Sequence, residues 1–71
     1  MTNTKLLREK IALSGYKIQY IAERIGITYQ GFLKKLNNES EFKASEIKML
    51  QTVLGLSKKD RDAIFFYEEC R

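Results

Sequence analysis

Residues 17–36 read KIQYIAERIGITYQGFLKKL and carry the strongest structural signal in the chain. Apolar residues in the first half recur at spacings of three and four, which is typical of one buried helix face: Ile18, Ile21, Ala22 and Ile25. Gly26 follows, where glycine closes a helix in the left-handed conformation without a Cβ penalty. This order predicts a helix over residues 17–24 that ends in a tight turn.

A second helix is predicted directly after this turn, over residues 29–37. Ile27 fills the corner, Thr28 is a good N-cap, and Phe32 and Leu36 supply the apolar face. Two short helices joined in this way are typical of a helix-turn-helix, whose second helix enters the major groove of DNA.

The rest of the chain predicts three further helices, over residues 3–13, 44–54 and about 58–68. Phe42 is expected to anchor the preceding connection to the core, and Ser57 with Asp60 forms a capping box at the last helix. The expected fold is therefore all-α, a single domain over residues 1–71 built as a compact bundle of about five short helices. Its helix-turn-helix core is expected at about 17–37.

The composition restricts the function. The 71 residues include no histidine and one cysteine, Cys70, so no metal site, cofactor or catalytic base is predicted, and the chain is not expected to be an enzyme. A lone cysteine forms no internal disulfide, which makes the cytoplasm the expected location. No apolar run is long enough to span a bilayer and no signal peptide is evident, so no membrane association is expected.

The positive charge is concentrated in one half of the chain. Residues 1–38 contain seven Lys/Arg and two Asp/Glu, a local charge of +5, whereas residues 39–71 contain six and seven, a local charge of −1. A polyanionic partner explains this bias. The alternative is a lysine-rich face that is merely solvated.

Residues 17–56 resemble the Cro and repressor class of phage helix-turn-helix regulators, which includes small xenobiotic-response-type repressors with a lambda-repressor-like DNA-binding domain. The pattern A-x3-G-I-T-x3-F carries this resemblance, at Ala22, Gly26, Ile27, Thr28 and Phe32. The later segments resemble short regulators of temperate phages: Lys35-Leu36-Asn37-Asn38, Phe42, Ser45-Glu46-Ile47 and Leu54-Gly55-Leu56-Ser57. The resemblance implies a transcription regulator of a lysis-lysogeny switch that binds double-stranded operator DNA in the host bacterial cytoplasm.

The resemblance also implies which side chains contact DNA. The predicted set is Lys17, Gln19, Thr28, Tyr29, Gln30, Lys34, Asn37 and Asn38. Gln30 can form a bidentate pair with adenine, and Lys34 can donate to guanine or to a phosphate. Gln30, Lys34 and Asn37 fall within about 60° on a helical wheel, on one side of the helix.

Two positions depart from this pattern and support a different partner. Ile18 stands where the family often has a glutamine that clamps a phosphate, and Leu33 stands where a polar contact is usual. The alternative function is an antirepressor, or modulator of repression, that binds a cognate phage repressor. The predicted partner or dimer contacts are Ile18, Leu33, Phe65, Phe66 and Tyr67.

Two further expectations concern single residues. Phe65 is assigned either to this contact surface or, with Ile64, to the core. Lys35 falls where an inward apolar residue is common, so its stem is expected along the core with its ammonium in water. The resemblance also allows a weak homodimer.

Overall fold

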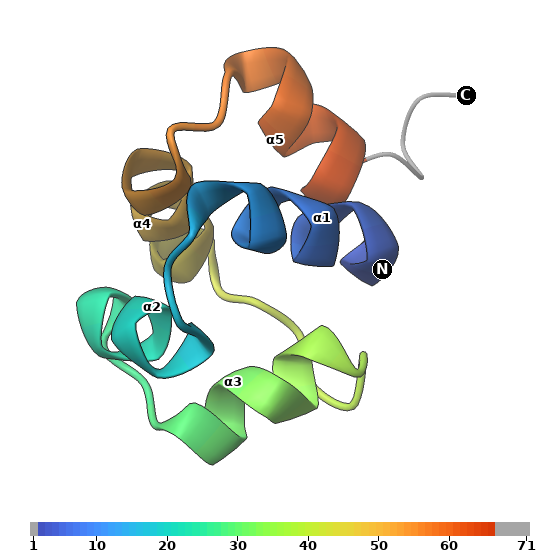
Figure 1. Ribbon diagram of the computed structural model, residues 1–71. Coiled ribbons are helices and arrows are strands. Elements are labelled where there is room, and N and C mark those ends of the chain that lie inside the picture. Colours follow the sequence, from blue (N-terminus) through green and yellow to red (C-terminus); the bar gives the residue numbers. More distant parts are fainter. Residues whose placement is uncertain (1, 67–71) are drawn as a thin grey trace.

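The computed structural model describes residues 2–66 and contains five α-helices, with no strand in this part of the chain. They are α1 (Thr4–Ser14), α2 (Ile18–Ile25), α3 (Tyr29–Leu36), α4 (Ala44–Leu54) and α5 (Lys58–Phe65). Figure 1 shows α5 above α1, with α2 and α3 below. The predicted all-α class is confirmed. Within the described residues, no helix combines the length and apolarity that crossing a membrane requires.

Capping residues determine where the helices begin and end. Glycines in the left-handed conformation close α1, α2 and α4. The Thr28 hydroxyl accepts a hydrogen bond from the Gly31 N–H (3.0 Å), and the Ser57 hydroxyl accepts one from the Asp60 N–H (3.0 Å). The Asp60 carboxylate accepts in return from the Ser57 N–H (3.4 Å), which lowers the pKa of this carboxyl. Both predicted N-caps are confirmed.

One core joins the inward faces of all five helices. Each helix contributes one or two fully buried large side chains: Leu7, Ile21, Phe32, Leu36, Leu50 and Ile64. Phe42, between α3 and α4, packs edge-on against Phe32 and Phe65 at centroid distances of 6.0 and 5.5 Å. Burying one such ring contributes about 1.5–3 kcal/mol. The predicted anchoring of this connection by Phe42 is therefore confirmed.

The predicted helix bounds agree with the structure to within one residue, except at the end of α5. This helix ends at Phe65, because the backbone of Phe66 has φ −126° and ψ 18° and leaves the helical conformation. The predicted continuation to about residue 68 is therefore wrong at Phe66. Tyr67 and the residues that follow it lie outside the described part of the chain.

The environment of Lys35 also differs from the prediction. Its side chain is only 11% exposed, and its Nζ donates to Oε1 of Glu46 (2.8 Å) and to the carbonyl oxygen of Glu41 (3.0 Å). The ammonium also lies 5.8 Å from the ring centroid of Phe42. A buried charge is tolerated when an ionised partner and further hydrogen bonds replace its water. The expectation of a solvated ammonium is therefore wrong.

Candidate nucleic-acid interface

The connection between α2 and α3 is a tight turn fixed by backbone hydrogen bonds. The N–H of Gly26 donates to the carbonyl groups of Ala22 and Glu23, and the N–H of Ile27 donates to Ala22 (3.0 Å). Gly26 has φ +83°, a left-handed conformation that most other residues adopt only with strain. Ala22 is 1% exposed, as expected where two helices approach closely. The turn therefore holds α3 in a defined orientation to α2.

α3 has one buried and one exposed side. Phe32, Lys35 and Leu36 are buried, whereas the polar residues at its start and on its outer side are all exposed: Thr28, Tyr29, Gln30, Lys34 and Asn37. These side chains offer amide, hydroxyl and ammonium groups, which form hydrogen bonds with base edges and phosphates. The outer side of α3 therefore carries the chemistry that groove contacts require.

The start of α2 brings a second group of predicted contacts to the surface. Lys17 is the N-cap residue, Gln19 lies in the first turn, and both are exposed. No side chain caps this end of α2. Because the first N–H groups of a helix lack partners within it and lie at the positive end of its dipole, they attract anions. This helix end, with the Lys17 ammonium, is suited to a phosphate.

A hydrogen bond that the sequence does not predict connects the end of α3 to α1. Nη2 of Arg8 donates to Oδ1 of Asn37 over 3.0 Å, and both residues are exposed. Arg8 therefore joins the candidate site, although it lies 29 positions away in the sequence. In the sequence, only the excess of positive charge in the first half of the chain could have indicated that Arg8 belongs to this site.

Asn38 is exposed as well, but its side chain has a structural role. Its Nδ2 donates to the carbonyl oxygen of Thr2 (3.3 Å), and its backbone has φ +60°. Asparagine is one of the few residues other than glycine that adopts this conformation routinely. Asn38 therefore supports the turn after α3 and holds the N-terminal segment.

Three cationic groups of the candidate interface have no acidic partner among the described residues. Within residues 2–66, no carboxylate forms an ion pair with Arg8, Lys17 or Lys34. Such charges attract a polyanion more strongly than charges that are already neutralised by a neighbouring carboxylate. The three side chains come from α1, the N-cap of α2 and α3, so three separate elements supply positive charge to the candidate interface.

The apolar residues predicted to contact a protein partner lie mostly in or against the core. Ile18 and Leu33 are partly buried and pack against core residues. Phe65 is 8% exposed and packs against Phe42. Its assignment to a contact surface is therefore wrong. Phe65 belongs to the core, which is the alternative that the sequence also allowed. Phe66 is partly buried.

The buried ion pair of Lys35 connects α3 to α4. Oε1 of Glu46 accepts from Nζ of Lys35 (2.8 Å) and from the N–H of Lys43 (2.9 Å). Burial opposes ionisation of Glu46, but the hydrogen bonds and positive charges of Lys35 and Lys43 outweigh it and lower the pKa of this carboxyl. Lys34 is the neighbour of Lys35 on α3. The Lys35–Glu46 ion pair therefore helps to set the direction in which the exposed side of α3 points.

The exposed side of α3, the start of α2 and Arg8 together make up the candidate nucleic-acid interface. Comparison of the chain with protein-family models, curated proteins and solved structures gave no match. The geometry and charge of this interface are therefore the features that indicate a function.

Proposed function

We propose that this chain is a helix-turn-helix transcription regulator of the phage type, which binds double-stranded operator DNA. α2 and α3 form the motif, and α3 is the recognition helix. One observation carries the proposal. Every residue predicted to contact DNA is exposed, although the Asn38 amide is engaged with Thr2: Lys17, Gln19, Thr28, Tyr29, Gln30, Lys34, Asn37 and Asn38.

In the proposed complex, α3 lies in the major groove, which is about 12 Å wide and admits a helix with its side chains. Gln30 pairs with an adenine, and Lys34 donates to a guanine or to a phosphate. The start of α2, with Lys17, holds a phosphate on one side of the groove. Arg8 contacts the backbone near the other end of α3, where Asn37 orients its guanidinium.

The alternative is an antirepressor that binds a partner phage repressor, and it has less support. It depended on apolar side chains at positions where DNA contacts are usual. Ile18 and Leu33 pack against the core, and Phe65 is buried within it. These residues therefore explain the fold without a protein partner.

Fluorescence anisotropy tests the proposal, with the labelled intergenic DNA that flanks the gene of this chain and a shuffled duplex of equal length. We expect preferential binding of the flanking DNA, with an affinity that falls steeply with salt as counterions are released. Gln30→Ala combined with Lys34→Ala should weaken binding by about 30-fold or more, because each good base contact contributes about 1–3 kcal/mol.

Lys59→Ala is the matched control, because it removes one positive charge from an exposed position on α5. It should change the affinity by less than about twofold. Equal binding to shuffled DNA, or full binding by the double variant, would contradict the proposal. Binding to the neighbouring repressor without binding to DNA would support the antirepressor instead.

A further inference from the structure

Leu33 lies at the border between the buried and the exposed side of α3. On a helical wheel it falls about 60° from the buried Leu36 in one direction and about 40° from the exposed Asn37 in the other. Its side chain is partly buried and packs against the core. The remaining part of Leu33 therefore reaches the surface on the side of α3 that carries the proposed base contacts.

Polar groups border the exposed part of Leu33. Gln30 and Asn37 lie about one turn before and one turn after it on α3, and both are exposed. Oδ1 of Asn37 accepts from Nη2 of Arg8 (3.0 Å), which brings a guanidinium to the same end of the helix. Tyr29, also one turn before Leu33, is 47% exposed and carries a hydroxyl at the tip of its ring. Leu33 is therefore an apolar spot between hydrogen-bonding groups.

The major groove of DNA offers one apolar group that matches this spot. The base edges in the groove present hydrogen-bond donors and acceptors, together with the C5-methyl group of thymine. A purine N7 or O6 atom facing Leu33 would lose its water to a side chain that forms no hydrogen bond, which is unfavourable. A thymine methyl group would exchange water for an apolar neighbour, which is favourable. Contact with Leu33 therefore discriminates in favour of thymine.

We propose that Leu33 is a specificity-determining residue that selects a thymine in the operator by contacting its C5-methyl group. This inference rests on the proposed function, because it requires α3 to lie in the major groove. Three residues advance a helix by about 4.5 Å, and successive base pairs are about 3.4 Å apart. The selected thymine should therefore lie about one base pair from the base that Gln30 reads.

The neighbours of Leu33 favour this contact over insertion into an apolar groove of a protein partner. An apolar groove that covered Leu33 would also cover Gln30 and Asn37, whose amides would lose water without gaining hydrogen-bond partners. In the major groove, the same amides meet donors and acceptors on the neighbouring base edges. DNA therefore satisfies both the apolar and the polar groups of this surface.

Replacement of single thymines by deoxyuridine in the flanking duplex tests the inference, because deoxyuridine lacks only the C5-methyl group and pairs as thymine does. Fluorescence anisotropy with the full chain measures the affinity for each duplex. At one position of each binding site, we expect the replacement to weaken binding about three- to fivefold, which corresponds to burial of one methyl group. In Leu33→Ala this ratio should fall below about 1.5-fold, because the apolar contact is lost.

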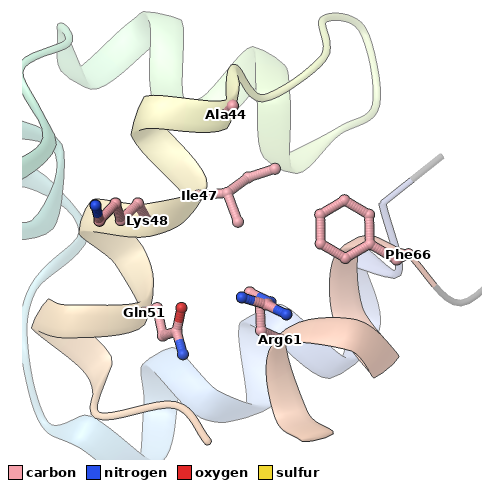
Figure 2. A pocket seen from close by; sticks show the side chains of 6 residues that line it. All are labelled: Ala44, Ile47, Lys48, Gln51, Arg61 and Phe66. Carbon is pink, nitrogen blue, oxygen red and sulfur yellow. The ribbon is translucent and has the colours of Figure 1, made fainter. Parts of the chain in front are cut away.

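Two control variants separate this contact from a general loss of affinity. Lys34→Ala removes a proposed contact from the same side of α3, so it should weaken binding to both duplexes and keep the ratio at about three- to fivefold. Ile47→Ala shortens another partly buried side chain that packs against the core, but this side chain lines the pocket between α4 and α5 (Figure 2). It should leave the affinity and the ratio within about twofold of the unaltered chain. Circular dichroism checks that each variant is folded.

The outcomes distinguish this inference from the proposed function. Binding to the flanking duplex without any position sensitive to deoxyuridine would overturn the inference and leave the proposed function standing. A ratio that persists in Leu33→Ala would also overturn it, since another residue would then contact the methyl group. Absence of binding to any duplex would overturn both. The scan with the unaltered chain gives the first and the last of these results even if Leu33→Ala fails to fold.

Discussion

Removal of the Lys35 ammonium should destabilise the fold strongly. Lys35→Met keeps a flexible apolar chain of similar length, so most of the packing near Phe42 remains. The carboxylate of Glu46, only 9% exposed, then keeps one hydrogen bond, from the N–H of Lys43. The carbonyl oxygen of Glu41 loses its donor as well. Breaking a buried ion pair from one side in this way costs about 3–5 kcal/mol.

For Lys35→Met we expect the free energy of unfolding to fall by about 2–4 kcal/mol. This loss is smaller than the general value because Glu46 keeps one donor and can take up a proton. A chain of this length has a total stability of about 4–10 kcal/mol, so the loss is a large fraction. Combining Lys35→Met with Glu46→Gln removes both charges while the new amide oxygen still accepts from Lys43. This double variant should recover about 1–2 kcal/mol of the loss, which is the coupling expected for a contacting pair.

Urea unfolding followed by circular dichroism at pH 7 and 10 °C measures these free energies. Lys34→Met is the matched control, because Lys34 is exposed and adjacent, and it should change the free energy of unfolding by less than about 0.5 kcal/mol. If Lys35→Met lowers the free energy of unfolding by less than about 1 kcal/mol, the stabilising role assigned to the Lys35–Glu46 pair is refuted. A double variant that is less stable than the single one would refute it as well.

Four further predictions concern stability and are measured by the same unfolding assay. Gly26→Ala should cost about 1–2 kcal/mol, because φ +83° strains alanine although the space around it is open. Gly31→Ala should change stability by less than about 0.5 kcal/mol, because the gain in helix propensity is offset where its Cβ would lie 3.0 Å from Oγ1 of Thr28. Ser57→Ala should cost about 1 kcal/mol through loss of the N-cap of α5. The lowered pKa of Glu46 means that the unfolded chain binds more protons in acid, so stability should fall as the pH drops below the ordinary glutamate pKa of about 4.3; Glu46→Gln should make this fall shallower.

The sequence predicted the helices well because their signals are local. Thr28 is followed three residues later by the N–H that its hydroxyl caps, and Gly26 directly follows the last apolar residue of α2. Spacing, capping and glycine position act within one or two turns, so a single chain displays them. The exposure of the outer side of α3 followed from the same periodicity.

The features that the sequence did not predict depend on contacts between distant residues. Lys35 reaches Glu46 across eleven positions, and Arg8 reaches Asn37 across 29. Neither contact has a periodic signal, because each depends on how helices pack after they form. Phe65 illustrates the same difficulty. It lies in a run of four large apolar residues, 64–67, and such a run does not show which side chain faces the core.

The proposed function requires that the exposed side of α3 and the start of α2 bind DNA. Amide chemical-shift mapping, with the unlabelled flanking duplex titrated into the 15N-labelled chain, tests this requirement. We predict that the largest changes fall at residues 17–19 and 28–37, with smaller changes near Arg8 and little change along α4 and α5. Largest changes along α4 and α5, or no changes at saturating DNA and low salt, would contradict the proposed function.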